Sequence, residues 1–243
     1  MKKYLILTGL LCLTSACVQR LPQTSKPVST QALILSPTTN QLYVFDLLNH
    51  RISYAIGTGQ VPTDIAVTPN GRSILVLNQL ENSISFYQRR DAQTFVFGGT
   101  IGTLTRPHKV LLNSSFSQAY VIFENQPWIQ ILELKSRTKP PTPEKTVRVS
   151  DALHLNAFAL STDGKTLYVS DKGDKSPKLY LLDTQNDFKT LQSVDLKDNS
   201  QISSLLFHKD KVYLSDFFQD EIKVWNHQTK TMENSISLKS ELT

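Results

Sequence analysis

The sequence predicts an all-β protein, a β-propeller of about five blades, and three observations carry this prediction. From residue 32 onward, short apolar segments are separated by turns, and no stretch has the 3.6-residue period of an amphipathic helix. One motif recurs five times, with its core residue at Leu35, Val67, Leu112, Leu160 and Phe207. These positions are 32, 45, 48 and 47 residues apart, steps that are typical of a four-stranded propeller blade.

Residues 1–16 have the features of a secretory signal peptide. Lys2 and Lys3 precede an apolar run that ends at Leu13, and this run is shorter than the roughly 20 residues that span a bilayer. Cys17 follows the small residues Thr-Ser-Ala and resembles the lipobox cysteine of bacterial lipoproteins. The resemblance implies cleavage before Cys17 and a lipid on this residue. Thr14 stands where the lipobox usually has Leu, so an ordinary cleaved signal is the alternative.

Residues 17–31 are expected to form a lipidated flexible tether, because they hold two prolines and small polar residues without hydrophobic periodicity. Residues 32–243 are then the propeller. Its expected blades are approximately 32–61, 62–106, 107–154, 155–201 and 202–243.

Composition agrees with export and excludes some partners. Cys12 and Cys17 are the two cysteines, one inside the signal and one at its end, so the mature domain has no intramolecular disulfide. Residues 1–31 hold four basic residues and no acid, which leaves about +1 of the net charge of +5 for the domain. A nearly neutral domain gives no electrostatic reason to expect nucleic-acid binding.

The repeated segments resemble the YVTN and NHL families of propeller repeats. Residues 46–52, Asp-Leu-Leu-Asn-His-Arg-Ile, are similar to the NHL signature, and residues 167–171, Leu-Tyr-Val-Ser-Asp, are similar to the YVTN signature. The resemblance implies a blade fold and structural roles for Asp46, Asn49 and Arg51, but no particular activity.

The alternation within these strands predicts which side chains are buried between blades. The expected core residues are Leu42, Val44, Leu167, Val169, Val212 and Leu214. The tyrosines between them are expected on the opposite face of each sheet: Tyr43, Tyr168 and Tyr213.

The short first step of 32 residues predicts that the first blade lacks its outer strand. The segment Arg51–Gly57 would then present an unprotected sheet edge, with Ser53, Tyr54, Ala55 and Ile56 as the candidate docking residues. Three occupants remain open: the tether near Val28–Gln31, a second copy in a homodimer, or a strand from an envelope protein or peptide. We expect the ring itself to close by packing, because an open arc would leave apolar blade faces in water. The alternative is an open arc that a partner or a second copy completes.

Polar residues converge at the expected entrance of the central channel, where the innermost strands begin. The candidate binding residues there are Asp64, His108, Lys109, Asn156, Ser203 and Ser204. They suit either ordinary polar capping of strand ends or a site for a small ligand or peptide. Only Asp64 and Asn156 offer side-chain oxygen ligands of the kind Ca²⁺ needs in larger number, so no metal or other cofactor is expected.

Two functions from different classes follow. The first is a lipoprotein of the cell envelope, anchored to the cell or outer membrane, whose propeller is a non-catalytic binding or scaffold module. The alternative is a lactonase-like propeller hydrolase with a site at the channel mouth, which rests on fold analogy. The sequence contains no nucleophile elbow, phosphate loop or histidine pair at ligand spacing, so it assigns no catalytic residue.

Overall fold

The computed structural model describes residues 30–68, 70–91, 93–113, 115–135, 139–173, 177–196 and 200–238. These residues form 20 strands in five antiparallel sheets, which confirms the all-β prediction and the propeller fold. Across these described ranges, no helix is long and apolar enough to span a membrane. The signal peptide, Cys17 and the tether up to residue 29 lie outside the described residues.

The sheets follow one another along the chain, each built from consecutive strands. The first sheet contains β1 (Gln31–Ser36), β2 (Gln41–Asp46) and β3 (Arg51–Gly57). The second contains β4 (Pro62–Val67), β5 (Ser73–Asn78), β6 (Ser83–Arg89) and β7 (Phe95–Gly102). The third contains β8 (Pro107–Leu112), β9 (Gln118–Phe123), β10 (Trp128–Glu133) and β11 (Thr142–Arg148).

The last two sheets continue the same order. The fourth contains β12 (Leu155–Leu160), β13 (Thr166–Asp171), β14 (Lys178–Asp183) and β15 (Lys189–Asp195). The fifth contains β16 (Ile202–His208), β17 (Lys211–Asp216) and β18 (Glu221–Asn226), followed by the short β19 (Thr231–Met232) and β20 (Ile236–Ser237), which both pair with β18.

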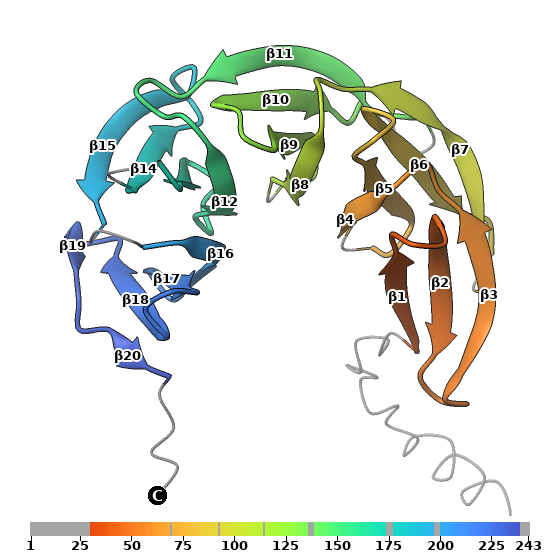
Figure 1. Ribbon diagram of the computed structural model, residues 1–243. Helices are drawn as coiled ribbons and strands as arrows, with labels where there is room; N and C mark the ends of the chain where they lie inside the picture. The colour runs from red at the N-terminus through yellow and green to blue at the C-terminus, as the bar shows by residue number, and fades with distance from the viewer. Residues whose placement is uncertain are drawn as a thin grey trace, which may run out of the picture.

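The five sheets form an open arc (Figure 1). The strands β4, β8, β12 and β16 line its centre, and β7, β11 and β15 run along its outside. The first and fifth sheets lie on opposite sides of a wide opening (Figure 1). The expectation of a closed ring is therefore wrong. Successive blades pack on one another, as β4 does on β8 and β12 does on β16, but the five sheets do not complete a full turn.

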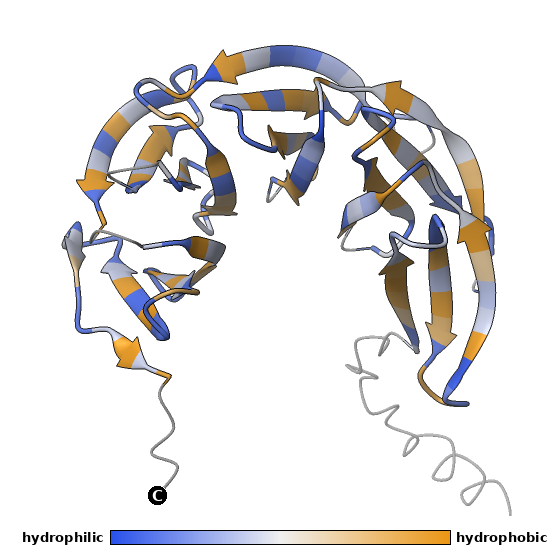
Figure 2. Cartoon of the chain, in the orientation of Figure 1, coloured by the Kyte–Doolittle hydropathy of each residue, from blue (hydrophilic) through white to orange (hydrophobic). Residues whose placement is uncertain are grey.

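The core lies between successive blades, as the alternation predicts. All six predicted core residues are fully buried, among them Val169 at 0% exposure. Leu167 and Val169 pack against the third blade, whereas Tyr168 packs against the fifth, so neighbouring side chains serve opposite faces of one sheet. Figure 2 shows hydrophobic and hydrophilic bands that alternate along outer strands such as β15.

The first sheet has three strands where the next three sheets have four, so the prediction of an incomplete first blade is confirmed. Its pairing register identifies the vacant position. In every later blade the first and second strands are joined with a β-bulge, and the second and third strands without one. The outermost pairing again contains a shift of one residue. The pair β1–β2 has no bulge, and β2–β3 has one between Val44 and Phe45.

Hydrogen bonds at the turns agree with this register. The side-chain oxygen of Asn40, in the turn between β1 and β2, accepts a bond of 2.9 Å from the backbone N–H of Val61. Asn82 lies in the turn between the second and third strands of the next blade, and its side-chain oxygen accepts a bond of 2.7 Å from the N–H of Arg106. Both asparagines have a positive φ, 54° and 50°. Asn40 thus occupies the place of a turn between second and third strands.

The three strands of the first blade therefore correspond to the second, third and fourth strands of the others. Contacts between blades support this, since β1 touches β4 in the way that β5 touches β8 and β9 touches β12. In Figure 1, β3 continues the outer line of β7. Among the described residues, the strand that the first blade lacks is therefore the one nearest the channel and not the outer strand that the sequence predicts.

Candidate binding site at the channel mouth and the arc opening

The structure brings the predicted channel-mouth residues together at the beginning of the inner strands. Asp64 lies in β4, His108 and Lys109 in β8, Asn156 in β12, and Ser203 and Ser204 in β16. Each of these strands has its bulge at this end, where one residue is left out of the pairing with the second strand. Bulges redirect side chains, so the repeated bulge explains why polar groups gather at this point.

Three of these six residues bind the backbone of another inner strand. The carboxylate of Asp64 accepts a bond of 2.8 Å from the N–H of Val110 in β8. Lys109 Nζ donates to the carbonyl oxygen of Ser203 at 2.6 Å, which connects β8 to β16 across the channel. The Asn156 amide donates to the backbone carbonyl of Ile202. These contacts join the blades at the mouth and support the capping interpretation.

Burial changes the proton affinity of the three titratable groups at the mouth. It raises the pKa of Asp64, against the opposing effects of the Val110 N–H and the charge of Lys109. It lowers the pKa of Lys109, which the carboxylate of Asp64 partly offsets. The pKa of His108 is lowered by burial and by the charge of Lys109, so the imidazole is neutral at pH 7. Among the described residues, no three His, Cys, Asp or Glu side chains gather where they could hold a metal ion.

The opposite end of the inner strands has a different character. Here a recess of about 370 Å³ lies between the third, fourth and fifth blades. Its lining is mostly apolar and includes Leu111, Phe116, Phe158, Leu205 and Phe207. The sequence alone does not predict this recess, because it forms only where the ends of three inner strands converge.

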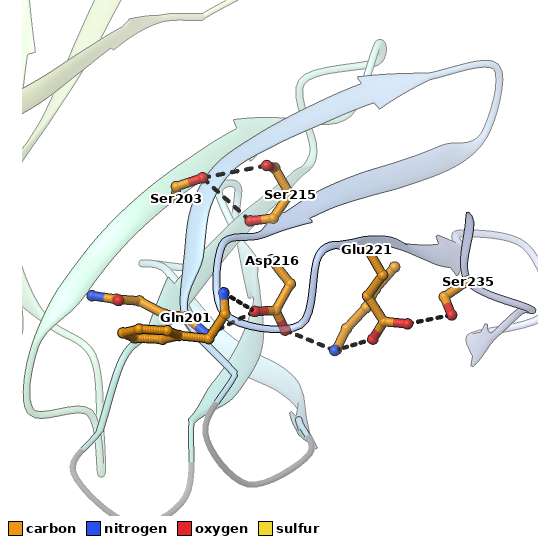
Figure 3. Close-up of polar contacts among 8 residues, drawn as sticks. Gln201, Ser203, Ser215, Asp216, Glu221 and Ser235 are labelled. Atoms are coloured by element: carbon orange, nitrogen blue, oxygen red, sulfur yellow. Dashed lines mark hydrogen bonds and ion pairs between the residues drawn. The ribbon is translucent and has the colours of Figure 1, made fainter. Parts of the chain in front are cut away.

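A buried charge network ties the fifth blade together (Figure 3). Lys223 Nζ lies 2.7 Å from a carboxylate oxygen of Asp216 and 2.6 Å from one of Glu221, and its side chain is 5% exposed. The other Asp216 oxygen accepts the backbone N–H of Gln201 at 3.1 Å. Ser235 donates to Glu221, which extends the network to the outer edge of the sheet.

The same positions hold a neutral version of this network in the second blade. Asn78 corresponds to Asp216, and its amide donates to Ser83 at 3.0 Å and to Ser85 at 2.9 Å. The pairing register makes Ser85 the counterpart of Lys223. Both networks hold the connection between blades, because Asn78 accepts the N–H of Gly59 at 3.0 Å as Asp216 accepts that of Gln201. We therefore assign a structural role to the charge network of the fifth blade.

The NHL-like residues also have structural contacts. One carboxylate oxygen of Asp46 accepts the backbone N–H groups of Leu48 and Asn49, and the other accepts the Asn49 side-chain amide at 2.7 Å. These bonds lower the pKa of Asp46, the Asn49 amide having the largest effect. Arg51 pairs with Asp46 across the strands β2 and β3. The three residues thus shape a tight turn on the outside of the first blade.

The predicted docking residues lie in β3, which the register places as an outermost strand. Tyr54 donates its hydroxyl to the carbonyl oxygen of Gln93 at 2.9 Å and accepts the N–H of Phe95 at 2.8 Å. Ile56 packs into the core between the first and second blades, while Ser53 and Ala55 are exposed. The strands β7, β11 and β15 also end their sheets. The edge of β3 is thus the ordinary outside of the propeller and is not created by a missing strand.

The tether near Val28–Gln31, one of the segments expected to pair with the edge of β3, lies only partly within the described residues. Val28 and Ser29 lie outside the described residues. Gln31 belongs to β1, on the far side of β2 from β3, and does not cover the edge.

The two faces at the opening of the arc carry exposed apolar side chains. On the first sheet Ile34 is 48% exposed, although its counterparts in the second and fourth blades, Val76 and Val169, are fully buried. On the fifth sheet Leu206 is 62% exposed. Phe217 and Phe218 are also exposed and touch edge to face with ring centres 5.5 Å apart.

Comparison with known proteins defines the class by fold. No family model and none of the curated proteins matches the chain. Several solved structures match the chain. A hydrazine synthase from Kuenenia stuttgartiensis matches with a TM-score of 0.71 and 14% identity over 82% of this chain and 60% of that chain. A putative 6-phosphogluconolactonase from Bacteroides uniformis matches with a TM-score of 0.71 and 14% identity over 86% of this chain and 69% of its own.

A second putative 6-phosphogluconolactonase, from Bacteroides fragilis, matches with a TM-score of 0.67 and 11% identity over 88% of this chain and 70% of that one. At these identities the likeness establishes the fold, that of a β-propeller repeat protein, and not the activity. This chain spans about 60% of the length of the hydrazine synthase chain and about 70% of the two others.

Proposed function

We propose that this protein is an envelope lipoprotein, anchored through a lipid on Cys17, whose propeller is a non-catalytic binding module. The observation that carries the proposal is the pair of apolar faces at the arc opening, represented by Ile34 and Leu206. Ile34 is exposed although its counterparts Val76 and Val169 are buried, and exposed apolar surface of this kind is typical of sites that bind other proteins. The partner is expected to bind at this opening.

The contacts at the channel mouth support a binding module over an enzyme. Asp64, Lys109 and Asn156 use their polar atoms to hold the backbone of other inner strands. A catalytic group needs its reactive atom within reach of a substrate. Here these atoms are within hydrogen-bond distance of backbone atoms of the protein itself.

Photo-crosslinking in intact cells tests the proposed binding surface. A photoreactive amino acid replaces Ile34 or Leu206 in the full-length protein, and Leu191, 50% exposed on the outer strand β15, is the matched control position. We expect a discrete crosslinked product of higher mass from the two opening positions and none from Leu191. Equal labelling at all three positions, or at none, would contradict a recognition surface at the opening.

A lactonase-like hydrolase is the second candidate, and the likeness to two putative 6-phosphogluconolactonases favours it. Its site would lie at the channel mouth, where Asp64 and the neutral His108 are the groups available for proton transfer. The test is hydrolysis of 6-phosphogluconolactone by the purified protein. Activity that disappears in both Asp64→Asn and His108→Ala would establish this candidate over the binding module.

A further inference from the structure

We infer that the vacant inner position of the first blade is a docking groove for an extended segment of a partner protein, which adds as a strand antiparallel to β1. This inference rests on the proposed binding function and names the kind of partner. In the four later blades this position holds β4, β8, β12 or β16. In the first blade β1 ends the sheet and, among the described strands, pairs with β2 alone.

The backbone of β1 is oriented to receive such a strand. The carbonyl of Thr30 accepts the N–H of Leu47, 2.8 Å away, on the side of β2. Successive residues of an antiparallel strand direct their N–H and C=O groups to alternate sides. Leu33 and Leu35 therefore direct these groups away from β2, toward the vacant position. A strand edge of this kind is a template for pairing with another chain.

The four complete blades indicate what side chains the position accepts. Near its end, each inner strand has three consecutive apolar residues: Ile65-Ala66-Val67, Val110-Leu111-Leu112, Phe158-Ala159-Leu160 and Leu205-Leu206-Phe207. In the second blade, Ile65 faces the preceding blade and Ala66 faces the following one. A guest strand in the first blade would place its first and third apolar residues over the face that exposes Ile34.

The tether is a poor candidate for the same position. A hairpin with the turn length of the second to fourth blades would place residues 23–25, Gln-Thr-Ser, at the apolar triplet. The shorter turn of the fifth blade would place residues 25–27 there, Ser-Lys-Pro. Neither is apolar. Pro22 or Pro27 would also remove a backbone donor within the strand. A second copy that supplied one of its inner strands would have to break the pairing of that strand in its own sheet, so a partner protein is the better occupant.

A synthetic peptide tests the groove on the full-length protein. The probe is a labelled nonapeptide with the sequence of residues 153–161, Leu-His-Leu-Asn-Ala-Phe-Ala-Leu-Ser. In the fourth blade Ser161 donates its N–H to the carbonyl oxygen of Thr166, so Ala159 also faces the second strand and Leu160 faces away. We expect the peptide and its N-methyl-Leu160 form to bind in fluorescence anisotropy. The N-methyl-Ala159 form should bind at least about tenfold more weakly, because it lacks a donor toward β1.

Amide hydrogen exchange locates the bound peptide. In the free protein the amides of Leu33 and Leu35 should exchange faster than those of Ala32 and Ile34, which bond β2. Saturating peptide should slow Leu33 and Leu35 about tenfold or more and leave the other two unchanged. Ile34→Arg should weaken binding, because a charge would replace the apolar contact, whereas Leu206→Arg on the other face of the opening should not.

Each contrary result overturns the inference in a recognisable way. Protection of Leu33 and Leu35 in the free monomer would mean that the chain itself fills the groove, and protection that rises with protein concentration would mean that a second copy does. Absence of peptide binding, or equal binding of both methylated peptides, would exclude strand addition. If crosslinking at Ile34 and Leu206 still captured a partner, the binding module would stand and only the strand mechanism would fail.

Discussion

Replacing Lys223 by Ser should destabilise the protein strongly, because it leaves two carboxylates in the core of the fifth blade without their cation. Asp216 is fully buried, and Lys223 Nζ lies 2.7 Å from it and 2.6 Å from Glu221. Removing one partner of a buried ion pair costs about 3–5 kcal/mol. In a domain of this size each kcal/mol lowers the melting temperature by about 2–4 °C. We therefore expect a fall of roughly 6–20 °C.

The second blade supplies the matched control. Its counterparts of the network residues are Asn78, Ser83 and Ser85, which satisfy one another without charge. The triple variant Asp216→Asn, Glu221→Ser, Lys223→Ser transfers this neutral network to the fifth blade. It should recover most of the stability that Lys223→Ser loses, because no unpaired charge remains buried.

The pKa of Asp216 determines how the stability loss in Lys223→Ser should change with pH. Burial raises the pKa of Asp216, but the ion pair with Lys223 and the Gln201 N–H outweigh it, so the folded pKa lies below the ordinary 3.8. The stabilisation from this carboxylate is therefore present above about pH 4 and is lost as the pH falls through the lowered value. Without the cation, burial dominates and the pKa of Asp216 rises. The stability difference between Lys223→Ser and the unaltered protein should thus be largest at pH 7 and shrink toward pH 4.

Urea denaturation followed by fluorescence measures these differences, because Trp225 is buried in the same blade. The comparison needs the unaltered protein, Lys223→Ser and the triple variant at pH 7 and pH 4. A loss below about 1 kcal/mol for Lys223→Ser at pH 7 would refute the reasoning, since it would mean that water reaches the network. Equal losses for the single and triple variants would mean that packing of the lysine stem, and not charge, is what matters.

Three further predictions concern the core, the anchor and the contact between the first two blades. Val169→Ala should lower the free energy of unfolding by about 1–3 kcal/mol in urea denaturation, through lost burial and a residual cavity; no change would contradict the blade register. Cys17→Ser should release the protein from the membrane fraction, and a variant that still sediments with membranes would show that the lipid is not the anchor. Tyr54→Phe removes the hydrogen bonds to Gln93 and Phe95. It should lower the free energy of unfolding by about 1–3 kcal/mol in thermal unfolding, because the N–H of the buried Phe95 loses its acceptor.

The strands and core could be predicted from the sequence because side-chain alternation is a local property. A strand that packs between two blades buries both faces, and the triplet Leu167-Tyr168-Val169 divides its side chains between the third and fifth blades as alternation requires. A shift of one residue would turn this set to the wrong neighbours. The number of sheets follows from counting such segments. The positions of the channel-mouth residues could be predicted for the same reason, since each lies near the start of an inner strand.

The position of each strand within the first blade could not be settled by the same local pattern. Residues 35–46 match the repeated motif of a first and a second strand equally well. In this chain the side chains of every strand alternate between two faces and every turn is polar, so the motif does not identify the strand's place in the blade. The distinguishing signal lies further along, where Ile56-Gly57-Thr58 precedes Pro62 as Ile101-Gly102-Thr103 precedes Pro107. Ile101 belongs to the outermost strand β7, so Ile56 belongs to an outermost strand as well. The buried network of Asp216 and Lys223 escaped prediction because its members face one another only in the paired register.

Ring closure depends on the angle at which sheets meet, and no local pattern in the sequence encodes that angle. The unpaired strand edge and the exposed apolar face nevertheless both lie on the first sheet. The first sheet lacks a strand at its inner edge, where Leu33 and Leu35 direct backbone groups outward, and the same sheet exposes Ile34 on its free face. A partner that covered only the free face would leave the backbone groups of Leu33 and Leu35 exposed to water. An isolated strand paired with β1 would cover the free face only in part. A β-rich partner that contributes an apolar edge strand satisfies both at once, because its strand pairs with β1 while its side chains cover Ile34.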